Sequence, residues 1–213
     1  MDVSIIIINY NTDALTLQAV ASVFKYVKNI DFEVIVLENN SKVTCLDVEL
    51  AKYENTYFYQ LDENIGFGKA NNYGFEKSKG DFIFLLNSDA YLINENAIIN
   101  FIDYLKAHPK VACVGGNLID DNGKHNISYG NFLSIEKLLF DYGLKQGTED
   151  YYYDKLATSK YCKMHVSVPV DYLTGAAIVI KREVIETYGL FNPSYFMYLE
   201  DMELGFRYKK RDY

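Results

Sequence analysis

Residues 82–86 form an unbroken apolar run, Phe-Ile-Phe-Leu-Leu, which is followed at once by Asn87-Ser88-Asp89. A run of this kind is typical of a strand that is covered on both faces in an α/β sheet. Such sheets bind ligands beyond the carboxyl ends of their strands, where Asn87, Ser88 and Asp89 would lie. The Asp89 carboxylate could hold a divalent cation there, and the cation a diphosphate. The alternative is an Asx turn that only ends the strand.

Segments with the pattern of strands alternate with helical segments along most of the chain. Residues 3–8 are β-branched and nearly all apolar, as in a central parallel strand. Thr12 or Asp13 could then cap a helix. The buried face of that helix is expected to consist of Leu15, Ala19, Val23 and Val27. Further strands are expected over residues 32–37, 56–61, 82–86, 111–115, 166–173 and 176–180, and further helices between 62 and 80 and over 94–107, 181–188 and 201–210.

The alternation of these elements, with short connections, implies right-handed crossovers and therefore an α/β fold with a mostly parallel sheet and flanking helices. A chain of 213 residues is long enough for one such domain with a sizeable core. We therefore expect a single domain over residues 1–213.

Charge and cysteine usage exclude several classes of protein. The formal net charge is −8 without a cluster of basic residues, which argues against binding to nucleic acid or to anionic membranes. Cys45, Cys113 and Cys162 are widely spaced, so they are expected to be reduced thiols rather than a disulfide scaffold or a zinc site. The sequence has no signal-peptide pattern and no apolar run near the ~20 residues of a membrane span. We expect a cytoplasmic chain.

A glycine-containing stretch, residues 62–74, precedes one of the expected helices. It does not fit a dinucleotide fingerprint because Asn71 stands where the third glycine would be, and it lacks the Gly-Lys-Ser/Thr of a Walker loop. A loop with exposed backbone N–H groups, with Lys69 nearby, could bind a diphosphate. Alternatively, the glycines only permit close packing of the helix on the sheet.

The last part of the chain carries acidic residues that could act as a general base. Glu200, Asp201 and Glu203 lie at an expected helix start, where one acid could serve as a cap. Three acids exceed what a cap needs, so Asp201 is the candidate general base. Before this helix, residues 145–163 are polar and rich in tyrosine, and we expect a mobile or lid-like connection there.

Together, these motifs resemble those of a family 2 glycosyltransferase with the GT-A fold, especially the rhamnosyltransferase-like members that build bacterial surface polysaccharides. Residues 86–89 stand in the place of the family's DxD motif, and Glu200-Asp201 in the place of its Glu-Asp motif. The matching segments, which occur in the family's order, are residues 4–11, 36–41, 64–74, 86–89, 174–177 and 200–204. Each match is weak by itself, whereas the ordered set is specific.

The resemblance implies a hexosyltransferase of the nucleotide-diphospho-sugar transferase type that inverts the transferred sugar. The donor would be dTDP-rhamnose or a UDP-sugar, and the acceptor a saccharide or a lipid-linked saccharide. Asp201 would be the base, and Asp89 with Asn87 would hold Mg²⁺ or Mn²⁺. The implied nucleotide-binding residues are Tyr10, Asn11, Glu38, Asn40, Gly66, Phe67, Lys69, Asn72 and Ser88.

Three positions depart from the family pattern. Asn87 replaces the first carboxylate of DxD, Glu38 stands where Asp is usual, and the basic residue often found at 71–73 is missing, with Lys69 as the candidate replacement. Residues 1–117 would bind the donor and residues 118–213 would form the acceptor side. Relatives usually continue beyond the Glu-Asp motif with helices that complete the acceptor side and often contact the membrane. Peripheral association with the inner face of the membrane through such a part is therefore expected.

Two other classes of function stay open at this point. A nucleotidyltransferase would also place a metal-held nucleotide on an α/β sheet, but it normally has a basic glycine-rich loop where this chain has Asn9-Tyr10-Asn11-Thr12. The other class is a non-catalytic module that binds a nucleotide sugar or a carbohydrate.

Overall fold

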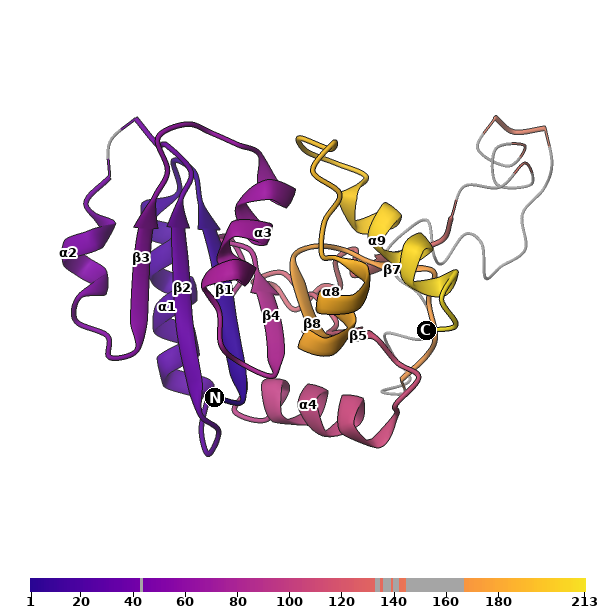
Figure 1. Ribbon diagram of the computed structural model, residues 1–213, viewed down its shortest axis with the longest axis horizontal. Coiled ribbons are helices and arrows are strands. Elements are labelled where there is room, and N and C mark those ends of the chain that lie inside the picture. Colours follow the sequence, from indigo (N-terminus) through magenta and orange to yellow (C-terminus); the bar gives the residue numbers. More distant parts are fainter. Residues whose placement is uncertain (43, 133–134, 136–138, 140–141, 145–166) are drawn as a thin grey trace.

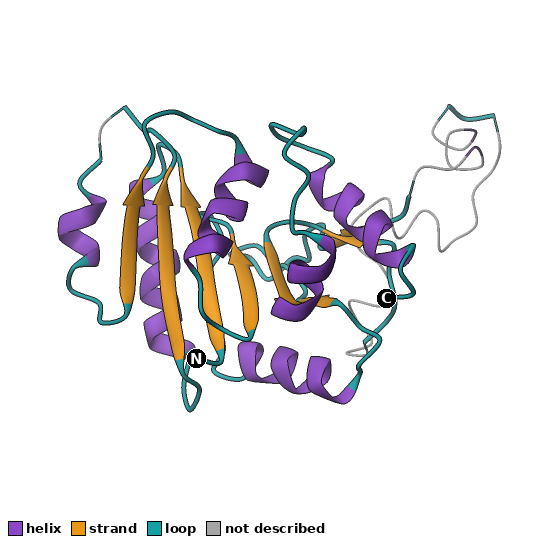
Figure 2. Cartoon of the chain, in the orientation of Figure 1, coloured by secondary structure: helices purple, strands orange, loops and turns teal. Residues whose placement is uncertain are grey.

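The computed structural model describes residues 1–42, 44–132, 135, 139, 142–144 and 167–213. The expected lid-like connection over residues 145–163 lies outside these described residues. Within them, the chain forms a six-stranded sheet with helices on both faces (Figures 1 and 2). The expected α/β class is therefore confirmed.

The main sheet has the strand order β3-β2-β1-β4-β8-β5. β1, β2, β3 and β4 are parallel to one another, whereas β8 runs antiparallel to its neighbours β4 and β5. A second, two-stranded antiparallel sheet consists of β6 and β7. The strands are β1 Val3–Asn9, β2 Phe32–Glu38, β3 Thr56–Gln60, β4 Phe82–Leu86, β5 Cys113–Gly115, β6 Tyr129–Gly130, β7 Tyr172–Leu173 and β8 Ala177–Lys181.

Six helices flank the strands in the described part of the chain. They are α1 Asp13–Tyr26, α2 Leu46–Leu50, α3 Phe67–Lys77, α4 Ala97–Ala107, α8 Arg182–Tyr188 and α9 Glu200–Lys209. Within the described ranges, none of them combines the length and the apolar character that crossing a bilayer would require.

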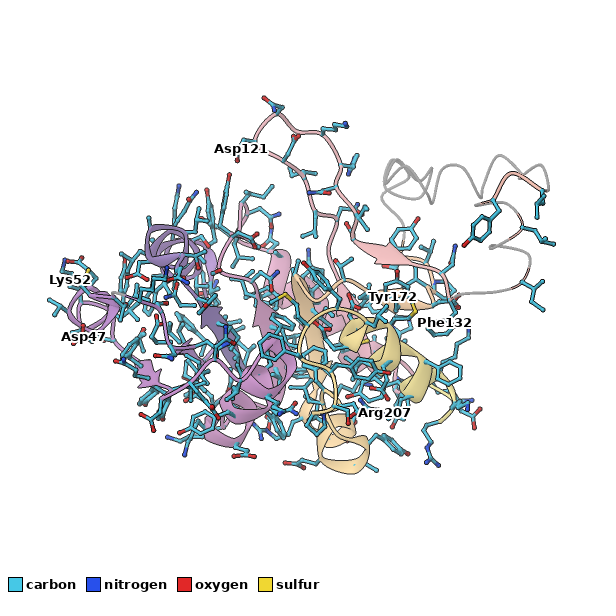
Figure 3. The ribbon with its side chains drawn as sticks, turned by 90° about the horizontal axis from the view of Figure 1, so that it is seen from above. Asp47, Lys52, Asp121, Phe132, Tyr172 and Arg207 are labelled. Atoms are coloured by element: carbon cyan, nitrogen blue, oxygen red, sulfur yellow. The ribbon has the colours of Figure 1, made fainter. Side chains whose placement is uncertain are left out.

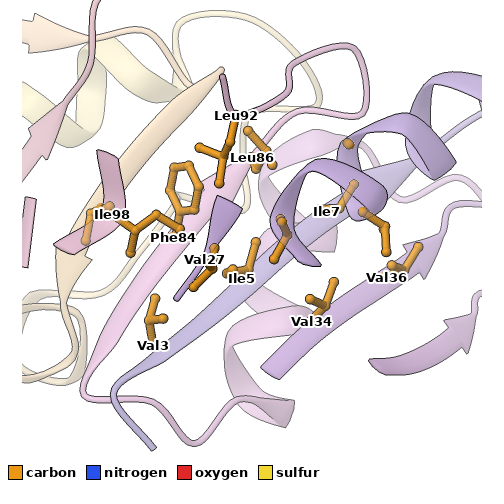
Figure 4. Packing of buried hydrophobic residues seen from close by; sticks show 14 of the residues in the cluster. Val3, Ile5, Ile7, Val27, Val34, Val36, Phe84, Leu86, Leu92 and Ile98 are labelled. Atoms are coloured by element: carbon orange, nitrogen blue, oxygen red, sulfur yellow. The ribbon is translucent and has the colours of Figure 1, made fainter. Parts of the chain in front are cut away.

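Each buried strand contributes side chains to two hydrophobic cores, one on each face of the sheet, because alternate side chains point to opposite faces. Val3, Ile5 and Ile7 of β1 belong to the core that includes side chains of α1, α2 and α4 (Figure 4). Ile6, between them, belongs to the core that includes side chains of α8 and α9. Two-sided burial thus explains why these strands read as continuous apolar runs.

Several expected boundaries were wrong in detail. Leu15 is 43% exposed, and the buried side chains of α1 are Thr16, Ala19, Val20, Ser22 and Val23. The strand expected over residues 166–173 is only Tyr172–Leu173 in the described residues, and it pairs with β6 rather than with the main sheet. The helix Leu46–Leu50 was not anticipated.

Candidate functional site

Three parallel strands end at one edge of the sheet and deliver polar residues there. Asn9 at the end of β1 is in register with Glu38 at the end of β2. Asn87, Ser88 and Asp89 follow β4 directly. In Figure 1 the arrowheads of β1, β2 and β4 point to the upper edge, and the loop that precedes α9 rises at this edge beside α3. The predicted placement of the residues that follow β1, β2 and β4 at a carboxyl edge is confirmed, whereas the loop before α9 was not predicted to lie there.

Asn9 is the hub of a buried hydrogen-bond network at this edge. Its Nδ2 donates to Asp13 Oδ1 (2.9 Å) and to Glu38 Oε2, and its Oδ1 accepts from Thr16 Oγ1 (2.7 Å). The hydroxyl of Thr12 lies 3.0 Å from both Asn9 Oδ1 and Ser88 Oγ. Asn9 has no exposed surface, so the network joins the ends of β1, β2 and β4 from below.

Glu38 is fully buried and holds a turn of the backbone. Its Oε1 accepts from the backbone N–H of Ser41 (2.6 Å), and Ser41 Oγ accepts from the backbone N–H of Asn11 (2.7 Å). The network therefore brings Asn11, Glu38 and Ser88 together, as three of the predicted nucleotide-binding residues. In this arrangement Glu38 supports the loop from beneath and does not face solvent.

Tyr10, Asn11 and Asn40 are exposed above this network. Asn11 and Asn40 both adopt positive φ, 57° and 64°. Asparagine tolerates this left-handed conformation better than most residues, which accounts for its presence in both turns. Two exposed polar loops thus lie side by side at the ends of β1 and β2, consistent with a ligand-binding edge.

The residues after β4 form a tight turn that leaves one carboxylate free. The backbone N–H of Ala90 donates to Asn87 O (3.1 Å), and the N–H of Asn87 donates to Ala176 O (2.9 Å). Asp89 is exposed, and its carboxylate makes no hydrogen bond or ion pair with another described residue. A free, exposed carboxylate with an amide oxygen two residues away fits a hard divalent cation.

No described group of three or more His, Cys, Asp or Glu side chains is arranged to hold a metal ion. Asp89 would therefore be the single charged ligand that these residues supply at the edge, so a cation there would need oxygen atoms from the bound donor. This agrees with the sequence, in which Asn87 replaces the first carboxylate of the motif.

The start of α3 is not the open loop of free N–H groups that the sequence suggested. The N–H of Gly66 donates to Asn64 Oδ1 (2.9 Å), and the N–H of Phe67 donates to Phe196 O (3.0 Å). The Asn72 carboxamide makes two hydrogen bonds to the backbone of Phe191. The expectation of exposed N–H groups was wrong at Gly66 and Phe67, because other parts of the chain occupy them. Lys69 is exposed.

The glycines of this stretch instead allow close approach, as the alternative interpretation held. A Cβ on Gly66 would lie 2.3 Å from Phe196 O, and a Cβ on Gly74 would lie 2.6 Å from Ile6 in the sheet. Gly74 therefore permits the helix to pack on the sheet, whereas Gly66 permits the contact with the loop before α9. The contact of Gly66, Phe67 and Asn72 with a nucleotide stays a prediction.

The three acids at the start of α9 have different surroundings. Glu203 is paired with Arg207 through two contacts of 2.9 Å, and Arg207 also donates to the carbonyls of Tyr188, Gly189 and Leu190. Glu200 is 7% exposed. Burial raises the pKa of Glu200, and the nearby Asp201 carboxylate raises it further.

Asp201 is partly exposed and borders a large cavity. The cavity has a volume of about 1180 Å³, and its described lining includes residues of α4, β5, β7 and α9 together with residues 110–112 and 167–171. Asp201 Oδ1 accepts a hydrogen bond from the N–H of Met202 (2.7 Å). Tyr172 also lines the cavity next to α9 (Figure 3). Burial raises the pKa of Tyr172, and the Asp201 charge adds to this effect. Of the three acids, Asp201 is thus the one that lines this cavity and is neither buried, as Glu200 is, nor paired with a basic residue, as Glu203 is.

The segment 174–177 lies between the β4 turn and the start of α3. Ala176 O accepts from the N–H of Asn87, and a Cβ on Gly175 would lie 3.2 Å from the Phe67 ring. This segment, expected on the acceptor side, therefore adjoins the proposed donor-side residues. The sequence indicated neither these contacts nor the role of Asn9, because they join residues far apart in the chain.

Comparisons with known proteins place this arrangement in a family. Residues 4–188 match the sequence profile of "Glycosyl transferase family 2". A low-salt glycan biosynthesis hexosyltransferase of Haloferax volcanii is 23% identical over 215 residues, which cover 99% of this chain and 62% of that protein. An uncharacterized glycosyltransferase of Rickettsia typhi is 29% identical over 209 residues, which cover 97% of this chain and 58% of that protein. The chain therefore spans about three fifths of the length of both relatives.

Solved structures of glycosyltransferases share the fold. The mannosyltransferase PcManGT of Pyrobaculum calidifontis, in complex with GDP-Man and Mn²⁺, has a TM-score of 0.65 at 16% identity, with 95% of this chain and 50% of that chain covered. TarS of S. aureus, residues 1–349, has a TM-score of 0.60 at 16% identity, with 98% and 55% covered. The predicted GT-A fold is confirmed by these neighbours.

Proposed function

Because the chain belongs to glycosyl transferase family 2 and is therefore a glycosyltransferase, we propose that it transfers a sugar, with inversion, from a nucleotide-diphosphate sugar to a saccharide or lipid-linked saccharide. The observation that carries this proposal is the pair of accessible carboxylates at the motif positions, Asp89 after β4 and Asp201 at the start of α9. Two accessible acids at separate places suit a reaction that must hold a diphosphate and deprotonate a hydroxyl.

The donor would bind at the carboxyl edge of β1, β2 and β4. Support comes from the exposed polar loops that carry Tyr10, Asn11 and Asn40, and from the solved relatives, whose structures include complexes with GDP-Man and with UDP-GlcNAc. Buried Glu38 would act through Ser41, whose backbone it holds, rather than by contacting the nucleotide in the present conformation. Ser88 and the exposed cation Lys69 would complete the donor side.

Asp89 and the amide oxygen of Asn87 would hold Mg²⁺ or Mn²⁺, as the Mn²⁺ bound in PcManGT suggests. A bound cation supplies positive charge that offsets the charge of the departing diphosphate. If Asp89 is the one charged ligand that the described residues supply, diphosphate oxygens would provide much of the coordination. Cation and nucleotide would then bind together more tightly than either would alone.

Asp201 would act as the general base of the transfer. Its carboxylate would accept the proton of the acceptor hydroxyl while the hydroxyl oxygen forms a bond to the anomeric carbon of the donor sugar. The bond from that carbon to the diphosphate breaks at the same time, and the diphosphate leaves with the electron pair. Attack from the face opposite the leaving group gives inversion.

The acceptor would approach from the cavity that Asp201 borders. The donor would be dTDP-rhamnose or a UDP-sugar, and the acceptor a saccharide or a lipid-linked saccharide. The product would serve surface polysaccharide synthesis, and the protein would be cytoplasmic, at the inner face of the membrane.

Release of free nucleoside diphosphate tests the proposed transfer. The 213-residue chain is incubated with individual nucleotide sugars, with a mixture of simple saccharide acceptors, and with Mg²⁺, Mn²⁺ or EDTA. Intact-mass detection should show nucleoside diphosphate and a glycosylated acceptor for one donor class, dependent on metal and lost in Asp201→Asn. Saturable donor binding without release under any condition would instead indicate a binding module. Pyrophosphate release from a nucleoside triphosphate and a sugar phosphate would indicate a nucleotidyltransferase.

A further inference from the structure

Asn72 connects helix α3 to the segment that leads into α9. Its Nδ2 donates to Phe191 O (2.8 Å), and its Oδ1 accepts from the N–H of Phe191 (2.9 Å), across 119 residues of sequence. A side-chain amide that hydrogen-bonds both the N–H and the C=O of one residue holds its backbone in place, as a neighbouring β-strand would. Phe191 is 3% exposed, so unpaired groups there would be costly.

A second anchor lies on the same end of α3. The N–H of Phe67 donates to Phe196 O (3.0 Å), and the rings of Phe67 and Phe191 lie 5.7 Å apart. Gly66 makes this approach possible, since any side chain there would collide with Phe196 O. The loop over residues 191–196 is thus held at both ends by the first two turns of α3.

Arg207 extends the connection to α9. It donates to the carbonyls of Tyr188, Gly189 and Leu190, immediately before Phe191, and it is paired with Glu203 on its own helix. A continuous path of hydrogen bonds therefore runs from Asn72 on α3 through residues 188–191 to α9. Asp201 lies on the first turn of α9. The buried side chains of Leu204 and Tyr208 hold the later turns of that helix in the core, and the path from Asn72 connects the helix to α3.

The loop between the anchors and α9 has little other support. The side chains of Phe196, Met197, Tyr198 and Leu199 are 57%, 49%, 76% and 55% exposed. Tyr198 and Leu199 also adopt positive φ, 70° and 68°, which is unfavourable for residues other than glycine. Because these exposed residues contribute little packing of their own, the loop is supported by the anchors on α3 at one end and by the buried residues of α9 at the other.

From these contacts we infer that Asn72 is a positioning residue, which holds the Phe191 segment and through it the base Asp201, and that it is not a ligand of the nucleotide. This inference rests on the proposed function, since it assigns Asn72 to the same reaction. It replaces the direct nucleotide contact that the resemblance implied for Asn72. Misplacement of a reacting group by about 1 Å can lower turnover on the order of 10²-fold, so a residue that acts only through position can be important for rate.

Two variants and a matched control test the inference. Asn72→Ala removes both hydrogen bonds, whereas Asn72→Asp keeps the shape and the acceptor for the Phe191 N–H but sets a carboxylate oxygen against Phe191 O. Glu76→Ala, at an exposed position of the same helix, is the control. Hydrogen exchange followed by mass spectrometry should show faster exchange over residues 191–204 in both Asn72 variants and unchanged exchange in the control.

Binding and turnover separate positioning from nucleotide contact. Affinity for nucleoside diphosphate with Mn²⁺ should stay within about twofold of the parent in Asn72→Ala, while turnover at saturating donor falls on the order of 10²-fold. An affinity that falls by the same factor as turnover, with unchanged exchange over residues 191–204, would overturn the inference. Should Asn72→Ala not fold, Asn72→Asp carries the same comparison. The exchange measurement requires no activity, so it can fail independently of the proposed function.

Discussion

Gly66→Ala should destabilise the protein more than alanine at a glycine that has a positive φ but open space around it. Gly66 adopts φ 84° and ψ 169°, a region that is essentially restricted to glycine, and placing alanine there costs on the order of 1–3 kcal/mol. The new Cβ would also lie 2.3 Å from Phe196 O, so the carbonyl must move away.

That movement breaks the hydrogen bond from the Phe67 N–H, which is worth about 0.5–1.5 kcal/mol. Adding this to the backbone term gives an expected loss of about 1.5–4.5 kcal/mol in the free energy of unfolding. At a urea slope of about 2 kcal/mol per molar, the unfolding midpoint should fall by roughly 1–2 M.

Gly123→Ala provides the matched control. Gly123 also has positive φ, 76°, but a Cβ there would meet nothing within 4 Å. Its cost should be limited to the left-handed backbone, about 1–2 kcal/mol. Urea unfolding of both variants, followed by far-UV circular dichroism because the chain contains no tryptophan, measures the difference. Equal losses in the two variants would show that the contact between Gly66 and Phe196 contributes nothing to stability, and that Phe196 does not anchor the loop to α3.

Three further predictions concern the proposed chemistry. Asp201→Asn should lose roughly 10²–10⁴-fold in turnover with nearly unchanged affinity for nucleoside diphosphate, whereas Asp89→Asn should lose the metal-dependent part of that affinity. Calorimetry measures the affinities and steady-state kinetics the turnover. Parental turnover in Asp201→Asn would exclude Asp201 as the base. Metal and nucleotide should tighten each other's binding by the same factor, so equal nucleotide affinity with and without Mn²⁺ would contradict a shared site. Finally, because the pKa of Glu200 is raised in the folded state above its ordinary value of 4.5, the folded state binds the proton more tightly and stability should fall as pH rises from about 4.5 through the raised pKa. Glu200→Gln should lack this decrease, and urea midpoints of parent and variant that change in parallel between pH 4 and 8 would show that Glu200 is not the cause.

The strands were predictable from the sequence because a strand buried on both faces is apolar at nearly every position. Residues 3–8, 32–37 and 82–86 are apolar at nearly every position, and each became a strand of the main sheet. The antiparallel direction of β8 was not predictable, since direction depends on how the chain returns to the sheet over the preceding sixty residues and leaves no local signal. The exposure of Leu15 shows the same limit, because a four-residue repeat fits more than one face of a helix.

The candidate site divides in a similar way. Placement of Asn87 and Asp89 at a strand end followed from sequence order alone, because parallel strands deliver their carboxyl ends to one edge. The use of Asn72 could not be foreseen, since its partner Phe191 lies 119 residues away and an asparagine in a polar loop suggests a ligand equally well. Different roles could be assigned to the three acids of α9 only from the structure, in which Glu203 forms an ion pair with Arg207 and Glu200 is buried.

The buried network beneath the edge also limits what chemistry residue 9 can have. Asn9 must give hydrogens to the carboxylates of Glu38 and Asp13 while it receives one from Thr16. Among uncharged side chains, only a primary amide offers two N–H donors and a carbonyl acceptor from one rigid plane. Conversion of Asn9 to aspartate would change a single group, yet it would place a third carboxylate beside those of Glu38 and Asp13 at a buried position. Loss of ammonia from this one amide would therefore turn the support of the β1 and β2 loops into a source of repulsion.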